Sequence, residues 1–295
     1  MAQQVTWRGL LPLAGAVVLF SSAWPVTKEA IGQGSAPIWF ALGRTALSTI
    51  VTLVLMVALR RLAIPRRRDL PFFFAVALCQ LSVFFICVHL ALVWVPAGRT
   101  SVITSVTLVF TVPASVFLLG ETVPRRRWIA VAMGVAGIAL LISPWSINWT
   151  APGVLVGHLF LLIAAAAVGV PMLVIRWRPP TLSMDQLLPW SFGLSSLVLL
   201  PFAMVMESPG LWSGPAFAAL AYVGVVAGPI GTWCYLLTMT HLPVVVASVG
   251  LLMTPAVGLV LSTWWLGEPL GLDLVLGTAF ILGGVAVSVL SGSTK

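Results

Sequence analysis

The segment PAGRTSVITSVTLVFTVPASVFLLGE, residues 96–121, occurs twice in the chain, and the rest of the sequence is organised around this repetition. The second copy, PVVVASVGLLMTPAVGLVLSTWWLGE, spans residues 243–268, at an offset of 147 residues without a gap. The copies share 8 of 26 aligned positions, and both end in Leu-Gly-Glu, at Glu121 and Glu268. This exceeds what compositional bias explains, and it predicts an internal duplication.

Bulk composition indicates whether this chain lies in water or in a membrane. Of its 295 residues, 60% are hydrophobic and 7% are charged, and the mean hydropathy is +1.11. Soluble domains carry about 25% charged residues, so most of this surface cannot face water. Apolar runs of about 20 residues, the length of a membrane-spanning helix, fill nearly the whole chain. They lack the alternation of about 10-residue barrel strands. We therefore expect an all-α polytopic membrane protein.

Ten transmembrane helices fit the apolar runs and the Pro- and Gly-containing connectors between them. They are expected at residues 9–31, 36–59, 70–94, 97–119, 125–145, 152–174, 184–206, 214–240, 243–266 and 270–290. Five helices fall in each copy of the duplication, residues 1–148 and 149–295. Because five is odd, the second copy enters the membrane from the opposite side. The two copies are then inverted repeats, an arrangement typical of secondary transporters.

Lysine and arginine predict the orientation, because cytoplasmic segments are enriched in both. With the N-terminus inside, the inside segments hold Arg8, Arg60, Arg61, Arg66, Arg67, Arg68, Arg125, Arg126, Arg127, Arg176, Arg178 and Lys295. The outside ends hold only Lys28 and Arg99, and Arg44 lies within the second helix. We expect a multi-pass protein of the cell inner (plasma) membrane with both termini in the cytoplasm.

The chain resembles the drug/metabolite transporter superfamily. The resemblance lies in Trp24-Pro25 in the first helix, in Pro37 followed seven residues later by Arg44, and in the two Leu-Gly-Glu endings, which match the EamA-type branch. It covers the full chain and is closest in character to the YddG-type exporters of aromatic amino acids. It implies a ten-helix exporter with a central cavity. One departure is Trp190, which stands near the position where Arg44 would be repeated.

The expected membrane interior lacks a central acidic residue, and Arg44 is the one basic residue clearly inside it. A buried carboxylate is the usual counter-ion for cationic drugs and the usual proton carrier, so proton-driven export of cations is disfavoured. Phosphorylated sugars would need several intramembrane cations. An aromatic or other large apolar amino acid, moved by alternating access, fits best. Other neutral hydrophobic metabolites or drugs are the alternative.

Polar and aromatic residues at depth are the candidates for a substrate cavity between the repeats. For each, the alternative is packing or a hydrogen bond within the helix, which is common for Ser and Thr. The candidates are Ser22, Trp24, Gln80, Phe84, His89, Ser101, Thr104, His158, Trp233, Tyr235, Ser248 and Thr254. His158 is also the candidate for proton coupling, because histidine titrates near neutral pH.

Pro113 and Pro255 lie inside the fourth and ninth helices, where a missing hydrogen bond permits a bend. We predict hinges at both, with a static kink as the alternative. The fifth and tenth helices are rich in glycine, including Gly137 and Gly284, and can pack closely. They are expected either to pack within the fold or to form the face of a homodimer.

Other function classes are disfavoured. HExxH, GxSxG and a pair of central aspartates do not occur in the sequence, so no enzyme, metal site or cofactor is expected. The net charge of +8 comes from short basic runs between apolar segments, so nucleic acid is not an expected partner. The expected partners are a small-molecule substrate and the lipid bilayer. A membrane scaffold without transport is the remaining alternative.

Overall fold

The computed structural model describes residues 7–120, 122, 125–142, 151–210, 212–242 and 244–290. Within these ranges every regular element is a helix. The elements are α1 (Trp7–Gly32), α2 (Pro37–Ala58), α3 (Leu70–Phe74), η1 (Ala75–Val83), α4 (Phe84–Trp94), α5 (Ala97–Thr104), η2 (Ser105–Thr107), α6 (Leu108–Leu119), α7 (Arg125–Ile142), α8 (Val154–Trp177), α9 (Met184–Met206), α10 (Gly214–Ala221), η3 (Tyr222–Ile230), α11 (Gly231–His241), α12 (Val244–Leu251), α13 (Met253–Leu266) and α14 (Leu272–Leu290).

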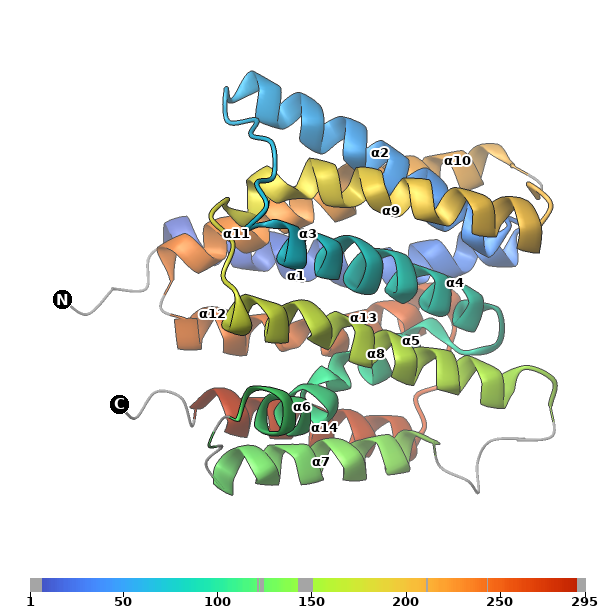
Figure 1. The fold of residues 1–295 in the computed structure, drawn as a ribbon. Coiled ribbons are helices and arrows are strands. Elements are labelled where there is room, and N and C mark those ends of the chain that lie inside the picture. Colours follow the sequence, from blue (N-terminus) through green and yellow to red (C-terminus); the bar gives the residue numbers. More distant parts are fainter. Residues whose placement is uncertain are drawn as a thin grey trace.

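Consecutive elements join into long helices that lie side by side in one bundle (Figure 1). In the described part of the chain, seven are long and apolar enough to cross a membrane, and they span residues 7–32, 37–58, 70–94, 97–119, 154–177, 184–206 and 214–241. The helix α7, the pair α12 and α13, and the helix α14 occupy the positions predicted for the other three. The predicted all-α polytopic fold is confirmed.

Two irregular helical segments recur at the spacing of the sequence repeat. A π-helical segment, with hydrogen bonds from residue i to i+5, forms at Ala75–Val83 and again at Tyr222–Ile230. The two segments are 147 residues apart, which is the offset between residues 96–121 and 243–268. Corresponding positions in the two sequence copies therefore share a departure from regular helical geometry.

The fourth and ninth membrane helices are both interrupted near their middle. The 3-10 turn η2 separates α5 from α6, with Val106 at φ −81° and ψ 16°. Leu252 separates α12 from α13 at the corresponding place. The two helices also end alike, because Gly120 and Gly267 adopt left-handed φ values of 64° and 67°, which glycine reaches without steric cost.

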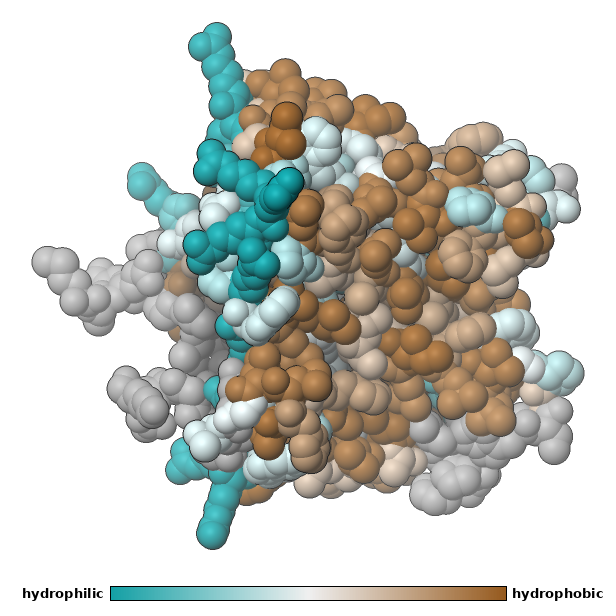
Figure 2. All heavy atoms as spheres, in the orientation of Figure 1, coloured by the Kyte–Doolittle hydropathy of each residue, from teal (hydrophilic) through white to brown (hydrophobic). Residues whose placement is uncertain are grey.

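The two repeated segments run in opposite directions through the bundle. In Figure 1, α5 and α6 run toward the end where α1 begins and α14 finishes, whereas α12 and α13 run away from it. The same end carries the hydrophilic surface in Figure 2. Its cations come from the connector between α2 and α3, the first turn of α7 and the last turn of α8. We call it the arginine-rich end, and the opposite end the arginine-poor end.

α7 packs against α14 through glycine. A Cβ atom added to Gly137 would lie 2.6 Å from Ile281 Cγ1 and 2.9 Å from the carbonyl oxygen of Gly277. One added to Gly284 would lie 2.8 Å from the carbonyl oxygen of Ala130. The backbones approach this closely because these positions lack side chains. In this structure the glycines pack within the fold, and a homodimer through the same helices stays a prediction.

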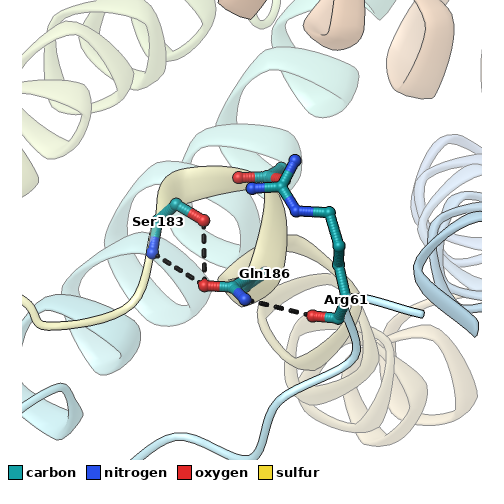
Figure 3. A network of polar contacts seen from close by, with 4 residues as sticks. Arg61, Ser183 and Gln186 are labelled. Atoms are coloured by element: carbon teal, nitrogen blue, oxygen red, sulfur yellow. Dashed lines mark hydrogen bonds and ion pairs between the residues drawn. The ribbon is translucent and has the colours of Figure 1, made fainter. Parts of the chain in front are cut away.

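Polar contacts fasten α2 to α9 at the arginine-rich end (Figure 3). Arg61 forms an ion pair of 3.0 Å with Asp185, and its carbonyl oxygen accepts a hydrogen bond of 3.1 Å from Gln186 Nε2. Gln186 Oε1 accepts hydrogen bonds from the backbone N–H and the hydroxyl of Ser183, at 3.1 and 2.9 Å. These contacts position the first turn of α9 beside the end of α2.

Asp69, directly before α3, joins the α2–α3 connector to the segment before α9. Its buried carboxylate accepts hydrogen bonds from the backbone N–H groups of Arg66, Thr181 and Leu182 and from the hydroxyl of Thr181. Burial by itself would raise the pKa of this carboxyl, but the hydrogen bonds together lower the pKa to about 2. Asp69 is therefore ionised in the folded protein near neutral pH.

Candidate functional site

A cavity lies inside the bundle, between helices from both halves of the chain. Its volume is about 320 Å³, within the range of about 300–1,000 Å³ that is typical of small-molecule sites. The first half contributes α1, α2, η1 and α4, and the second half contributes α8, α9, η3, α11 and α13. Both π-helical segments reach the wall, through Gln80 and Gly228.

A second compartment of about 430 Å³ continues from the central cavity. The two share wall residues that include Gln80, Phe192 and Thr232. The second compartment reaches Phe72 and Met184, which lie in the first turns of α3 and α9, beside the arginine-bearing connectors. The hollow space in the bundle therefore extends toward the arginine-rich end.

A third compartment of about 300 Å³ lies against the two interrupted helices. Its wall includes Ser105 and Leu252, at the interruptions themselves, and it shares Trp24 and Thr254 with the central cavity. Ser21, one turn before Trp24, donates a hydrogen bond of 2.8 Å to the carbonyl oxygen of Thr254. The helix interruptions thus line a compartment that shares two wall residues with the central cavity.

Aromatic side chains form much of the central wall. The rings of Trp24 and Phe84 meet edge to face, with their centroids 6.4 Å apart and their planes at 72°. Phe20, Phe85 and Phe192 line the same cavity. Such rings offer flat apolar faces against which another aromatic or large apolar group can pack.

Arg44 is the one Lys, Arg, Asp or Glu residue on the described walls of the three compartments. Its guanidinium carbon lies 4.3 Å from the centroid of the Phe85 ring, a cation–π contact. No hydrogen bond or ion pair joins this guanidinium to another described residue. The acidic residues of the described chain lie near helix ends or in connectors: Glu29, Asp69, Asp185, Glu207, Glu268 and Asp273. Glu121 lies outside the described residues.

Two buried polar atoms of the central cavity have no hydrogen-bond partner among the described residues, Thr27 Oγ1 and His89 Nε2. Their side chains are 2% and 0% exposed. His89 Nδ1 lies 2.8 Å from the carbonyl oxygen of Phe85, which can only accept, so Nδ1 carries a hydrogen. In the neutral ring, Nε2 is then an acceptor. Buried polar atoms are normally paired, so these two atoms are exceptions among the side chains that line the cavity.

Many of the residues predicted from the sequence lie on these walls. They are Trp24, Gln80, Phe84, His89, Ser101, Tyr235 and Thr254. Of the predicted hinges, Pro255 also lines the third compartment, three residues after the interruption at Leu252. Pro113 lies inside α6, after the interruption at η2. Hinge motion at either proline stays a prediction.

Ser22 and Thr104 are bonded elsewhere and do not contribute to the described cavity walls. The hydroxyl of Ser22 lies 2.6 Å from the hydroxyl of Tyr222 and also donates to the carbonyl oxygen of Val18 at 2.7 Å. Thr104 is buried and donates to the carbonyl oxygen of Thr100 at 2.9 Å. For Thr104 this is the within-helix hydrogen bond that was the alternative interpretation.

His158 and Trp233 also lie away from these walls. His158 is buried in α8, with Nδ1 2.7 Å from the carbonyl oxygen of Val154, and Trp233 is half-buried in α11. The side chain of Ser248 lies outside the described part of the chain. Proton coupling through His158 stays a prediction.

The sequence interpretation omitted several wall residues, of which Phe20, Thr27, Arg44, Ser48 and Thr232 are the most informative. Helical spacing could have found two of them. Phe20 is four residues before Trp24, and Ser48 is four residues after Arg44, so each pair shares a helix face. Arg44, the one basic residue expected inside the membrane, was itself a signal, because intramembrane charges usually mark function.

Polar contacts join helices at the arginine-poor end, one set between the two halves and one within the first half. Glu268, after α13, accepts hydrogen bonds of 2.6 and 2.9 Å from the first two backbone N–H groups of α5. A helix N-terminus favours a negative charge at this place. Lys28 of α1 donates to the carbonyl oxygens of Leu92 and Val95, at the end of α4. These contacts join α13 to α5 and α1 to α4.

The sequence profile of the EamA-like transporter family matches residues 7–143 and again residues 155–290. A probable terminal-alkyne amino-acid exporter of Streptantibioticus cattleyicolor is 30% identical, over 90% of this chain and 89% of the relative. The uncharacterized transporter YvbV of Bacillus subtilis is 26% identical, over 97% of this chain and 93% of the relative. One crystal structure superimposes on this chain with a TM-score of 0.67 and 20% sequence identity, over 95% of this chain and 96% of the other chain. It has the same fold.

The similarity extends along the full described chain and includes both halves. The matched relatives are transporters, and this confirms the expectation that the chain is not an enzyme.

Proposed function

The chain belongs to the EamA-like transporter family and is a multi-pass membrane transporter, and on that premise we propose that it exports aromatic or other large apolar amino acids. Transport proceeds by alternating access through the central cavity. The two five-helix halves, residues 1–148 and 149–295, act as inverted repeats. The arginine-rich end faces the cytoplasm of the cell inner (plasma) membrane, as the excess of basic residues there favours.

One observation carries the alternating-access mechanism. The cavity extends toward the arginine-rich end, while Glu268 joins the two halves at the arginine-poor end. The walls include matched irregular segments from each half, η1 with η3 and the interruptions at η2 and Leu252. Matched halves of opposite direction support a second state of similar free energy, in which the open and closed ends are exchanged.

The composition of the walls supports the substrate class. Trp24 and Phe84, with Phe20 and Phe192, provide apolar and aromatic surface. Gln80, Thr232 and Thr254 supply a small number of polar groups. A cationic substrate would find no carboxylate on the described walls. The relative from Streptantibioticus cattleyicolor is named as a probable exporter of a terminal-alkyne amino acid, which supports amino acids over other metabolites.

A flux assay with purified protein in liposomes tests this proposal. Labelled tryptophan is the substrate, and unlabelled phenylalanine, leucine, threonine and methyl viologen are competitors. We expect saturable flux that phenylalanine and leucine inhibit, that threonine inhibits weakly and that methyl viologen leaves unchanged. Protein-free liposomes are the control. Tryptophan flux equal to that control, or inhibition by the cation alone, contradicts the proposal.

Proton coupling is measured in the same liposomes. If His158 carries a proton, a pH gradient accelerates tryptophan flux, and His158→Gln removes the acceleration while basal flux persists. Flux that is independent of the gradient assigns His158 to packing in α8. Transport is then facilitated diffusion, and the substrate proposal is unaffected.

Export of other neutral hydrophobic metabolites is the second candidate. The observation in its favour is that the exposed lining of the cavity is mostly apolar, which does not by itself require an amino acid. Competition by a neutral indole without a backbone amino acid group, as strong as competition by tryptophan, would favour this candidate.

A further inference from the structure

The central cavity has two chemically different parts. Trp24, Phe84, Phe20 and Phe192 supply the aromatic part. The polar part contains Arg44 and two buried atoms without a partner among the described residues, Thr27 Oγ1 and His89 Nε2. These three side chains come from α1, α2 and α4, so they belong to different membrane helices and share one internal space.

Arg44 and His89 both contact the ring of Phe85. The Arg44 guanidinium carbon lies 4.3 Å from the centroid of the Phe85 ring. The centroid of the His89 ring lies 5.7 Å from the same point, with the two rings nearly perpendicular. Phe85 therefore contacts both a permanent cation and an imidazole whose Nε2 atom can accept a hydrogen bond.

We infer that this polar part binds the backbone of the amino acid, an inference that rests on the proposed function. Arg44 holds the α-carboxylate through its fork of N–H donors, and the hydroxyl of Thr27 donates to the same carboxylate. His89 Nε2 accepts a hydrogen bond from the α-ammonium group. The side chain of the substrate then packs against Trp24 and Phe84.

The charges of the site explain this assignment. A guanidinium stays protonated under ordinary conditions, and its planar donors match a carboxylate in two parallel hydrogen bonds. A cation that is desolvated without a partner is unfavourable, and a bound carboxylate removes this cost. The described cavity walls offer the ammonium group no carboxylate, so it relies on neutral acceptors such as His89 Nε2. The carboxylate contact is therefore the stronger of the two.

This assignment predicts an order of affinity among tryptophan analogues. Tryptophan should bind best, since it satisfies both backbone contacts. Indole-3-propionate, which keeps the carboxylate and lacks the ammonium, should be intermediate. Tryptophanamide, which lacks the carboxylate and places a second cation beside Arg44, should compete about ten- to hundredfold more weakly than tryptophan, as expected for loss of a charge-assisted contact.

Competition against labelled tryptophan in liposomes measures this order for the wild-type protein, and equilibrium binding measures it for variants that transport slowly. Arg44→Gln should lower the affinity for tryptophan and indole-3-propionate about ten- to hundredfold and leave the affinity for tryptophanamide nearly unchanged. Thr27→Val, which keeps the shape of the side chain and removes its hydroxyl, should lower the affinity for tryptophan and indole-3-propionate by a smaller factor. Arg178→Gln, an exposed arginine at the arginine-rich end, is the matched control and should keep the wild-type order.

The results separate this inference from the proposed function. If wild-type protein transports tryptophan but tryptophanamide competes equally, the carboxylate assignment is overturned and amino-acid transport stands. If Arg44→Gln keeps its unfolding temperature and the wild-type preference for carboxylates, Arg44 is not the anchor. If wild-type protein binds no tryptophan, the proposed function fails, and this inference fails with it. If Arg44→Gln selectively loses affinity for tryptophan and indole-3-propionate, the two compounds with a carboxylate, the assignment is supported.

Discussion

Replacing Glu268 with alanine should open the arginine-poor end of the cavity more often. Its carboxylate bridges α13 and α5 by accepting hydrogen bonds of 2.6 and 2.9 Å from the first two N–H groups of α5. These contacts join helices from different halves, so opening this end must break them. The substitution therefore raises the free energy of the closed arrangement and leaves the arrangement open at this end unaffected.

The expected magnitude follows from the geometry of this contact. Removing a side chain that caps a helix N-terminus costs about 0.5–2 kcal/mol, and the favourable charge at the helix dipole contributes a similar amount. We take about 1–2 kcal/mol for the pair of contacts. This corresponds to a roughly 5- to 30-fold increase in the population open at the arginine-poor end.

Thiol labelling measures this population. The native Cys79, Cys87 and Cys234 are first replaced with alanine, and Leu92→Cys is introduced as a reporter. Leu92 is 0% exposed and lines the central cavity beside the contact of Lys28. A membrane-impermeant maleimide added from the arginine-poor side should label the reporter about 5- to 30-fold faster when Glu268→Ala is present.

Glu29→Gln is the matched control, because it removes an acid near the same end. Glu29 accepts a hydrogen bond of 2.7 Å from Trp265 Nε1 and does not cap a helix. Labelling with this variant should stay within about twofold of the parent, as is usual for surface substitutions. Equal labelling with and without Glu268→Ala, in proteins of equal unfolding temperature, would refute the role of Glu268 as a closing contact. An equal increase with Glu29→Gln would also refute it.

Three further substitutions test packing, acid stability and substrate contact. Gly137→Ala should destabilise the protein by about 1–3 kcal/mol, because the added Cβ would clash in the α7–α14 interface. Gly32→Ala is the control and should leave stability unchanged, because no atom lies within 4 Å of its added Cβ. Thermal unfolding in detergent compares the two variants. Asp69 has a folded pKa of about 2, below the unfolded value of about 3.9, so its stabilisation is present above pH of about 4 and lost as the pH falls toward 2. Asp69→Asn should therefore unfold at a lower temperature than wild type at pH 6, by a margin that narrows at pH 3. Trp24→Ala should weaken tryptophan binding by roughly two- to tenfold and leucine binding less. The reason is that an aromatic contact between the substrate and Trp24, which packs against Phe84, contributes about 0.5–1.5 kcal/mol. Competition in liposomes measures both affinities.

Each of these has a clear contradicting result. Equal unfolding temperatures for Gly137→Ala and Gly32→Ala would refute the close approach of α7 and α14. A margin between wild type and Asp69→Asn that stays constant from pH 6 to pH 3 would refute the assigned pKa of Asp69. Equal losses for tryptophan and leucine in Trp24→Ala would remove Trp24 from the aromatic wall.

The sequence alone determined the membrane environment and the places of the helices along the chain. The predicted ranges 97–119 and 184–206 coincide with the helices at Ala97–Leu119 and Met184–Met206. A helix that crosses a bilayer must satisfy its backbone hydrogen bonds internally and expose apolar side chains to lipid. Both demands act along the local sequence, so a run of apolar residues with Pro or Gly at its ends is sufficient to locate the element.

The sequence repeat also relates local structural features that occur once in each half of the chain. The offset of 147 residues, found between residues 96–121 and 243–268, also relates the π-helical segments and the left-handed Gly120 and Gly267. The positions of the interruptions were not predicted. The break at Ser105–Thr107 contains no proline, and it packs against α8.

Only the tertiary structure decided which side chains meet. Among the predicted residues, His89 lies on the cavity wall and His158 does not. Ser101 and Thr104 both bond their own helix, but of the two only Ser101 lines a described compartment. A membrane helix is apolar around most of its circumference, so no hydrophobic stripe indicates which face turns inward. The rotation of each helix depends on close packing with its neighbours, and that packing brings Arg44, Thr27 and His89 from three helices to one cavity.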